Sequence, residues 1–407
     1  MNAVLRPALF ARWCVLLAAL FAAVGAAPGL LAQGEDPAPT ETTGLQQPHA
    51  PARSTVYEVR NPSAVSNYVV DGPRARAMVD RLVVAATGQN SVASAWRSLV
   101  EPKDVVGIKI SATGGDLGST HRAVVEAIID GLRSAGVPLA NILVWDRDAD
   151  DLRTAGYLDY KGRSTLPCAV LGIDPKYGYD PKEQYTAPYL GKLMWGDLDF
   201  KGRQIPADLG LRPSDDEADP LSSRPAAAAT PETRSKNAQA LSDQNLSNVS
   251  HYCTILSRRV TKIVNVPVFS DNYFAGLGGA LYNVTIPNID NWRRLVAPPK
   301  YGVSAIPELY SDPHLGGKIV LNITDGLVAQ VAGGPYFQPL YARTHATLYA
   351  SRDAVALDSV VLRLLDGWRV QARLPSLKDT AEHVKTAADA GLGNFAPEKI
   401  DLRSLNP

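Results

Sequence analysis

Hydrophobic positions in this chain alternate between runs typical of strands and stripes typical of helices. Residues 104–110 form a short apolar run rich in β-branched residues, and residues 141–145 form a second one. Between them, a loop at 111–118 precedes a helix that Ser119 or Thr120 is expected to cap and whose apolar residues share one face. A strand–helix–strand unit of this kind predicts a right-handed crossover between parallel strands.

The same pattern recurs along the rest of the chain. Helices are predicted at 72–86 and 353–365, and further apolar runs predict strands. These strands are residues 260–266, 318–324 and 346–350. Alternating strands and helices favour an α/β fold, with a parallel or mixed central sheet and helices on both faces, in one large domain over residues 56–407.

A long segment after the second predicted strand departs from this pattern. Residues 157–200 are rich in Tyr, Gly and Pro, and residues 212–247 are rich in Ala, Ser, Asp, Asn and Pro. We therefore predict an irregular insertion at residues 157–250, whose second part is a mobile or weakly helical surface excursion. The tyrosines are more typical of packing within this arm than of a substrate platform.

Residues 1–32 have the composition of a signal peptide. Arg6 and Arg12 form a positively charged first part. An apolar run follows at residues 14–24, and small residues come after it. The run is interrupted by Pro28 before it reaches the roughly 20 apolar residues of a permanent anchor. We therefore favour cleavage and export, to the periplasm or outside the cell, over retention as a membrane anchor.

The composition of the remaining chain narrows the class of protein. The sequence has 41 basic and 41 acidic residues among 407, and removal of residues 1–32 leaves 39 against 41. A nucleic-acid-binding protein would have a basic surplus, so that class is not favoured. Residues 33–55, rich in Pro, Thr, Gln and Glu, predict a disordered spacer, and no later segment predicts a membrane span.

Two cysteines, Cys168 and Cys253, follow the predicted leader. They are compatible with one disulfide in an oxidising compartment and equally with two buried free thiols. Two cysteines are too few for a four-cysteine iron–sulfur site, and their spacing excludes a CxxC redox pair. No iron–sulfur cluster is therefore expected.

Polar residues follow most of the predicted strands. Ligands of open α/β sheets bind beyond the carboxyl ends of the strands, so these residues are the candidates for chemistry. They are Lys109 and Ser111 with Gly114 and Gly115, Asp146 and Asp148, Asn265, Asp325, and Ser351 with Asp353. The turn at Gly333 and Gly334 is a further place where backbone can approach a ligand.

Each local feature also has an ordinary structural interpretation. The glycine-rich loop at 111–118 suits an anion site at a helix N-terminus or a plain tight turn, and it lacks the spacings of dinucleotide and P-loop motifs. His121 is a candidate for polarising a bound group, or it covers the sheet edge. Residues 146–151 alternate carboxylates as a calcium loop does, but Asp151 replaces the required glycine, which favours an acidic helix N-terminus instead.

Asp358 lies within the helix predicted at 353–365, which Asp353 is expected to cap. A buried carboxylate needs a partner, and Lys109 or Arg352 is the expected one, in either a structural or a catalytic ion pair. The sequence has no GxSxG and no HExxH motif, so serine-hydrolase and zinc-protease classes are not favoured.

Several segments together resemble the family called domain of unknown function 362. They are residues 105–111, 119–125, 144–147, 152–157, 264–267, 275–283, 325–326, 333–335, 353–358 and 390–393. They occur in the family's order over most of residues 90–403. The resemblance implies a prokaryotic α/β protein, often exported, without a firmly established reaction. Some relatives hold ferredoxin-type clusters, for which this chain lacks the cysteines.

The chain also departs from the family pattern. Where relatives have a Lys and an Asp-His pair after the third strand, residues 270–272 are Ser-Asp-Asn, and Tyr282 rather than Lys precedes the matched Asn283. Ser111 stands where the family commonly has Asn. The residues that match are Lys109, His121, Asp325, Asp353 and Asp358.

Two functional hypotheses follow from these residues. In the first, which we favour, the protein is an exported enzyme that acts on a small anionic molecule with metal or redox chemistry. Lys109 would bind the negative group and His121 would transfer a proton, while Asp325 and Asp358 would hold a divalent cation or orient Lys109. In the second, the same cleft is a ligand-binding or interaction module without turnover.

Both hypotheses use the same further ligand-binding residues. These are Ser111, Gly114, Gly115, Asn283, Gly333, Gly334 and Asp353. Both also require Lys109, His121, Asp325 and Asp358 to lie around one cavity.

Overall fold

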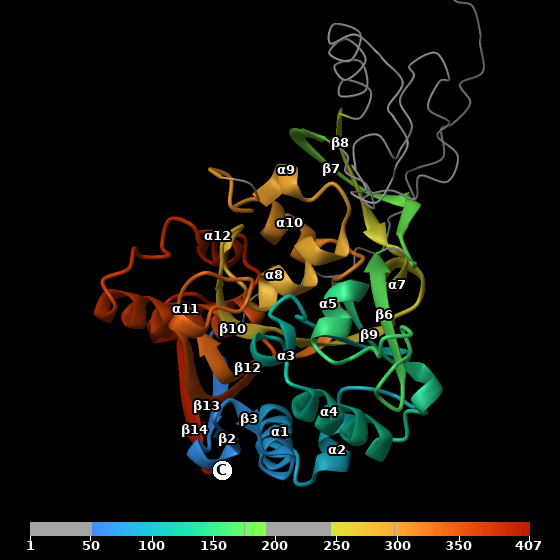
Figure 1. Ribbon diagram of the computed structural model, residues 1–407, viewed down its shortest axis with the longest axis vertical. Helices are drawn as coiled ribbons and strands as arrows, with labels where there is room; N and C mark the ends of the chain where they lie inside the picture. The colour runs from blue at the N-terminus through green and yellow to red at the C-terminus, as the bar shows by residue number, and fades with distance from the viewer. Residues whose placement is uncertain (1–50, 175, 193–245, 297) are drawn as a thin grey trace, which may run out of the picture. The chain divides into compact units, whose positions relative to one another are not determined.

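A ten-stranded mixed sheet runs through the described part of the chain (Figure 1). The structure is a computed structural model that describes residues 51–174, 176–192, 246–296 and 298–407. The strand order is β14–β1–β13–β12–β9–β4–β5–β6, and β10 and β11 extend the sheet beside β12.

The elements follow in chain order. The strands of the sheet are β1 (Ser54–Arg60), β4 (Val106–Ile110), β5 (Ile142–Asp148), β6 (Ala169–Asp174), β9 (Lys262–Val266), β10 (Val268–Asn272), β11 (Gly276–Leu277), β12 (Ile319–Gln330), β13 (Ala342–Ser351) and β14 (Ile400–Leu405). The helices are α1 (Gly72–Thr87), α2 (Val92–Arg97), α3 (Gly115–Gly118), α4 (Arg122–Ser134), α5 (Ala149–Thr154), α7 (Thr254–Arg258), α8 (Ala280–Val284), α9 (Arg293–Val296), α10 (Ala305–Ser311), α11 (Ala354–Gln371) and α12 (His383–Asp389). Two short strands, β2 (Val65–Ser66) and β3 (Val69–Val70), form a hairpin of their own.

Most neighbouring strands of the large sheet are parallel. β4 pairs in parallel with β5 and with β9, so Lys109 lies opposite Trp145 on one side and opposite Asn265 on the other. β13 runs antiparallel to both β12 and β1. The predicted α/β fold with a mixed central sheet is therefore confirmed.

Helices cover both faces of the sheet and form two hydrophobic cores. α1, α2 and α4 pack on one face against Ile108 and Ile110, whereas α8, α10, α11 and α12 pack on the other. Alternation along β4 therefore directs Gly107 and Lys109 toward the second face. Gly107 is required there, because a Cβ atom would lie 2.5 Å from the Trp145 ring. The same alternation brings Lys109 beneath α8, with which β4 is in contact.

Helix boundaries agree with the sequence in part. α1 and α11 begin after Asp71 and Asp353, whose carboxylates accept backbone N–H groups of the first turn, as expected for Asp353. The predicted caps of α4 are wrong. The Ser119 hydroxyl donates to the carbonyl of Ala112 and the Thr120 hydroxyl to that of Val266, because both side chains fasten the preceding loop to the sheet.

The predicted insertion contains more regular structure than its composition suggested. Ala169–Asp174 forms β6, an edge strand of the large sheet, and β7 (Tyr179–Lys192) pairs antiparallel with β8 (Leu246–Cys253) as a separate two-stranded arm. The surface excursion predicted at 212–247 lies almost entirely outside the described residues. The leader at 1–32 also lies outside them, and β1 begins at Ser54, within the predicted 33–55 spacer.

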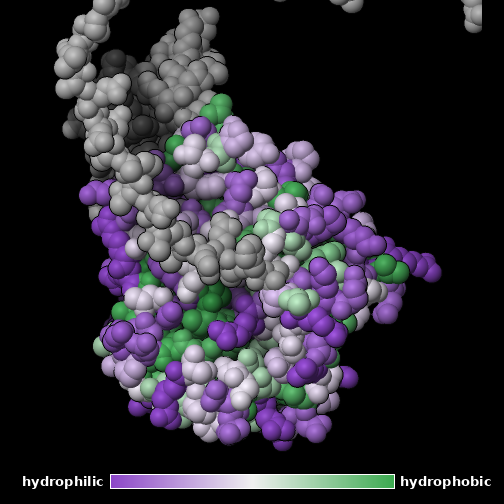
Figure 2. All heavy atoms as spheres, turned by 180° about the vertical axis from the view of Figure 1, so that it is seen from behind, coloured by the Kyte–Doolittle hydropathy of each residue, from purple (hydrophilic) through white to green (hydrophobic). Residues whose placement is uncertain are grey.

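Seen from behind, the described surface is mostly hydrophilic, with apolar residues gathered in part of its lower half (Figure 2).

Cys168 and Cys253 are buried free thiols rather than a disulfide. Burial raises the thiol pKa to about 11 in Cys168 and to about 12 in Cys253. Across the residues with assigned structure, no helix combines the length and apolarity that a membrane crossing requires.

Candidate functional site

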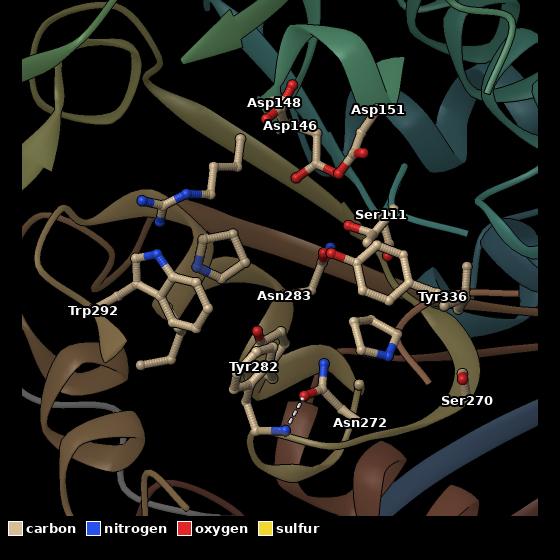
Figure 3. A pocket seen from close by; sticks show the side chains of 18 of the residues that line it. Ser111, Asp146, Asp148, Asp151, Ser270, Asn272, Tyr282, Asn283, Trp292 and Tyr336 are labelled. Carbon is tan, nitrogen blue, oxygen red and sulfur yellow. Dashed lines mark hydrogen bonds between the residues drawn. The ribbon is translucent and has the colours of Figure 1, made fainter. Parts of the chain in front are cut away.

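A cavity of about 200 Å³ lies beyond the carboxyl ends of β4 and β5. Its walls come from the segments that follow these two strands, from β10, from α8 and from the loop after β12 (Figure 3). The labelled residues of Figure 3 that line it are Ser111, Asp146, Asp148, Asp151, Ser270, Asn272, Tyr282, Asn283, Trp292 and Tyr336. A cavity of this volume suits a small molecule.

One wall of the cavity is acidic. Asp146 and Asp148 end β5, and Asp151 follows on the first turn of α5. Asp148 caps this helix by accepting the backbone N–H of Asp150 at 2.7 Å, which is the helix-start role that the sequence favoured over a calcium loop. The three carboxylates come together because the turn from strand to helix places them on the same side (Figure 3).

Asp151 is the carboxylate of this wall whose protonation changes near neutral pH. Burial raises the pKa of Asp151 to about 6, and the negative charges of Asp146 and Asp148 add to the effect. A hydrogen bond with Thr113, which also lines the cavity, opposes the rise. A group that exchanges its proton close to the working pH is suited to general acid–base chemistry.

The opposite wall is aromatic and amide-rich. Tyr282 and Asn272 face the acidic wall across the cavity, with Trp292 and Tyr336 at the sides (Figure 3). Burial raises the pKa of Tyr282 to about 12, so its phenol is a neutral hydrogen-bonding group. The guanidinium carbon of Arg147 lies 5.1 Å from the Trp292 ring centroid. Tyr336 is 63% exposed and therefore lies at the mouth.

A buried network of hydrogen bonds supports the floor of the cavity. The side chain of Lys109 is fully buried, and its Nζ donates to Asp146 Oδ1 at 2.6 Å, to Asn283 Oδ1 at 3.2 Å and to the Ile110 carbonyl at 2.7 Å. The second Asp146 oxygen accepts the backbone N–H of Ala112 at 2.6 Å. Lys109 therefore supports two cavity residues without lining the cavity itself.

The contacts of Lys109 differ from those expected of a residue that binds a substrate anion. All three of its ammonium hydrogens are used by protein oxygens, so none remains to bind a substrate anion. Its carboxylate partner is Asp146 rather than Asp325 or Asp358. Sequence analysis could not make this assignment, because the pairing depends on how β4 and β5 lie side by side.

His121 and Asp325 form a separate pair. Asp325 Oδ2 accepts both the backbone N–H of His121, at 2.7 Å, and a hydrogen bond with its Nδ1, at 2.9 Å. Burial lowers the pKa of His121, but the charge and hydrogen bond of Asp325 outweigh it and raise the pKa overall. His121 Nε2 is buried with no partner among the described residues, and neither side chain lines the cavity. Asp325 lies within β12 rather than after it, because that strand continues to Gln330.

Asp358 is buried on the far side of α8. Its oxygens accept the backbone N–H groups of Ala280 and Leu281 at 2.6 and 2.9 Å, at the N-terminus of that helix. The expected cationic partner, Lys109 or Arg352, is therefore replaced by two amides. Burial raises the pKa of Asp358 to about 7, and the two amides oppose the rise.

The four predicted catalytic residues thus do not converge on one cavity. Lys109, the His121–Asp325 pair and Asp358 each have their own protein partners. Of the predicted ligand-binding residues, Ser111 and Asn283 line the cavity.

The predicted glycines and Asp353 lie outside the cavity wall. Gly114 makes a tight turn, since a Cβ atom there would lie 2.3 Å from the carbonyl carbon of Gly118, and Gly115 has a φ of +66°. Gly334 lies against Asp271 rather than against a ligand: its N–H donates to Asp271 Oδ1 at 2.9 Å. Asp353 is distant because β13 is antiparallel, so the chain after it leads toward the opposite edge of the sheet.

Sequence reasoning missed several residues of the site. Asp151 was noted as the residue that replaces the required glycine of a calcium loop, although four carboxylates in six positions after a predicted strand were a usable signal. Asn272 and Tyr282 were noted as departures from a family pattern. Trp292 and Tyr336 gave no local signal, because loops far apart in the chain bring them to the cavity. Among the described residues, no three His, Cys, Asp or Glu side chains are placed to hold a metal ion.

Comparisons with known proteins agree with part of the resemblance. A family model described as Domain of unknown function (DUF362) matches residues 239–363, which are therefore a DUF362 domain. The resemblance noted over residues 90–403 is confirmed for this segment. The domain supplies the aromatic wall of the cavity, whereas Ser111, Thr113 and the three carboxylates precede it.

A solved structure is also similar at low identity. A crystal structure of a Thermotoga maritima protein from a structural genomics consortium is similar to this chain, with a TM-score of 0.36 and 10% identity over 76% of this chain and 61% of that one. The chain thus spans about three fifths of the length of that protein. No curated protein matches the chain.

Proposed function

With the DUF362 domain at residues 239–363 as a premise, we propose that the protein is an enzyme that binds a small polar molecule in the acid-lined cavity, where Asp151 exchanges a proton with it. The observation that supports this most strongly is the position of Asp151, on the cavity wall beside Asp146 and Asp148. Its pKa of about 6 leaves both protonation states populated near neutrality.

The wall chemistry indicates which groups of a ligand would meet Asp151. Carboxylates accept hydrogen bonds, so a hydroxyl, amine or ammonium group fits the acidic wall better than an anion does. Tyr282 and Trp292 offer apolar ring surface to the remainder of the molecule. The anionic substrate expected from Lys109 loses its support, because that ammonium is fully used within the protein.

A non-catalytic binding module is the second candidate. The observation in its favour is that Asp146 and Asn283 already have protein partners, so part of the cavity is a fixed framework rather than a reactive group. His121, the proton-transfer residue expected from the sequence, is absent from the cavity wall.

A thermal-shift screen followed by product analysis tests the proposal. The full-length protein is screened against amines, amino acids, sugars and organic acids, and compounds that raise Tm are followed by NMR for conversion. Asp151→Asn is the test variant. Asp150→Asn is the matched control, because Asp150 lies on the same helix, is 82% exposed and does not line the cavity.

We expect neutral or cationic compounds to raise the Tm of the wild type and of Asp150→Asn, and conversion to be lost in Asp151→Asn. The rate should change with pH around pH 6. If the stabilising compounds bind Asp151→Asn as well as they bind the wild type, their binding site does not include Asp151, which would contradict the proposal. Binding that requires Asp151, without any conversion, would establish the second candidate instead.

Export remains a separate proposal that rests on the leader at residues 1–32. We expect the mature protein to begin after residue 26, 27 or 32. Edman sequencing of protein from the native host, with fractionation of cytoplasm, membrane and exported material, tests this. An intact leader found in the membrane fraction would support the anchor instead.

A further inference from the structure

Lys109 contacts two cavity residues while remaining outside the cavity. Its side chain is completely buried, and its Nζ bonds to the carboxylate of Asp146 and to the amide oxygen of Asn283, both of which line the cavity. A buried ammonium is costly unless it is paired, so its position needs an explanation beyond packing.

We infer that Lys109 is a positioning residue for this cavity: it fixes the orientation of Asp146 and Asn283 and compensates part of the negative charge that Asp151 faces. The inference deepens the function proposed above and rests on it for its biological meaning. Its test uses the ligand-free protein, so the two can fail independently.

The orientation of Asn283 follows from the chemistry of an ammonium group. Lysine only donates hydrogen bonds, so Asn283 must present its oxygen to Lys109, and its Nδ2 must then donate elsewhere. It donates to Asn265 Oδ1 at 2.8 Å, which leaves the Asn265 Nδ2 to donate to Asn322 Oδ1, also at 2.8 Å. Asn322 Nδ2 in turn donates to the carbonyl of Ser351 at 3.3 Å.

Lys109 and the neighbouring backbone carbonyls set the donor direction of this chain together, because Asn283 Nδ2 also donates to the Lys109 carbonyl at 3.3 Å and Asn265 Nδ2 to the Ala280 carbonyl at 2.9 Å. Lys109, Asn265, Asn322 and Ser351 come from β4, β9, β12 and β13, four adjacent strands of the sheet. Removing the ammonium would remove the donor that holds the Asn283 oxygen and the Asp146 carboxylate in place, whereas the carbonyls would still orient the amide nitrogens. The floor of the cavity would then lose the group that joins Asp146 to Asn283.

The charge of Lys109 acts on the pKa of Asp151 indirectly, through the carboxylate of Asp146. Burial lowers the pKa of Lys109, and the charge and hydrogen bond of Asp146 oppose this. Asp146 is also the neighbour whose charge raises the pKa of Asp151 most. The other charged and titratable groups near Asp151 are Asp148 and Asp150 on its own side and Arg147, Asp271, Tyr282, Arg293 and Tyr336 among the other cavity residues.

A carboxyl titration followed by NMR tests the inference. The full-length protein is labelled with ¹³C at aspartate carboxyl carbons, and the Asp151 signal is identified from its absence in Asp151→Asn. The variants are Lys109→Gln, which keeps an N–H for Asp146 but removes the charge, Lys109→Arg, which keeps the charge, and the double variant Lys109→Gln with Asp146→Asn.

In the wild type we expect a step near pH 6. Lys109→Gln should raise the Asp151 step by about one pH unit, because the negative charge of Asp146 then lacks its cation. Lys109→Arg should restore the wild-type step. The double variant should titrate below the wild type, since the Asp146 charge is gone.

A folded Lys109→Gln protein whose step stays near pH 6 would overturn the inference and leave Lys109 with a merely structural role. If Lys109→Gln does not fold, the double variant is compared with Asp146→Asn, because the two proteins differ only at Lys109 and neither contains an unpaired carboxylate at position 146. Asp151 steps at the same pH in these two proteins would also overturn the inference. The proposed enzyme function would survive either result, because it depends on binding and conversion at Asp151.

Discussion

Two buried ionisable side chains contact the short helix α8, and they have different kinds of hydrogen-bonding partner. Lys109 lies beneath Asn283 of this helix and is matched by a carboxylate, an amide oxygen and a carbonyl. Asp358 lies at the N-terminus of the same helix and is matched only by two backbone N–H groups. Burial raises the pKa of Asp358 to about 7 although the two amides oppose the rise, and burial lowers the pKa of Lys109 although Asp146 opposes that shift, so each set of partners compensates burial only in part.

Breaking the compensated pair should have the largest effect on stability. Lys109→Met leaves Asp146 buried beside an apolar side chain, and we expect the free energy of unfolding to fall by about 3–5 kcal/mol. Urea denaturation at pH 7 measures this. The double variant Lys109→Met with Asp146→Leu removes both charges and should recover at least ~2 kcal/mol of the loss. A double variant as unstable as the single one would show that packing, not charge, explains the loss.

Asp358 should make stability depend on pH in the opposite sense from a salt-bridged carboxylate. Its folded pKa of about 7 exceeds the ordinary 3.8, so the folded state binds more protons between these values and stability falls as pH rises through them. Between pH 4 and pH 7 this amounts to about 3 kcal/mol. Denaturation curves of wild type and Asp358→Asn, compared at each pH, isolate the contribution. A difference between the two proteins that does not change with pH would show that Asp358 is not protonated on folding.

His383 offers a smaller effect of the other sign. It is fully buried, neither ring nitrogen has a partner among the described residues, and burial lowers its pKa to about 3. In the unfolded chain His383 therefore binds a proton below about pH 6.5, whereas in the folded protein it stays neutral until about pH 3. Stability is consequently lost as pH falls through this range. From pH 7 to pH 5 we expect a loss of about 2 kcal/mol, absent from His383→Leu. Equal pH slopes for the two proteins would contradict this.

The smallest effect is expected at the surface. Asp150 pairs with Arg153 one turn along α5, where the two side chains are 82% and 42% exposed. Exposed pairs of this kind contribute about 0.5 kcal/mol or less, so Asp150→Asn should leave the denaturation midpoint almost unchanged at any pH. A loss above ~1 kcal/mol would mean that the acidic end of α5 stabilises the cavity wall more than its exposure suggests.

Local sequence patterns were enough to predict many of the helices and strands, but not which strands pair with each other or in which direction. The β4–α4–β5 unit was predictable because its apolar periods lie within residues 106–148, although the expected caps of α4 were wrong. The long helix α11 behind Asp353 was predictable in the same way. β6 was missed because Ala169–Asp174 is short and follows a tyrosine-rich segment. The direction of β13 depends on a partner strand, and local composition does not encode it.

The cavity lies at the edge of the sheet where the sequence predicted a site, and its lining overlaps only in part with the predicted residues. The rule that ligands bind beyond parallel strands selected Ser111, Asp146 and Asp148, which do line the cavity. It failed for Asp325, which lies inside β12, and for Asp353, because β13 is antiparallel. The aromatic wall could not be foreseen, since Trp292 and Tyr336 approach through loops whose course only the folded chain defines.

The place of β1 in the sheet has a consequence for synthesis of the chain. This strand, at residues 54–60, is bordered by β13 and β14, which comprise residues 342–351 and 400–405. A ribosome therefore releases β1 long before either neighbour exists, and its exposed N–H and C=O groups remain open to unwanted pairing until translation is nearly finished. The nascent polypeptide should depend on a holding chaperone during that interval, and its last assembly step should follow completion of the chain.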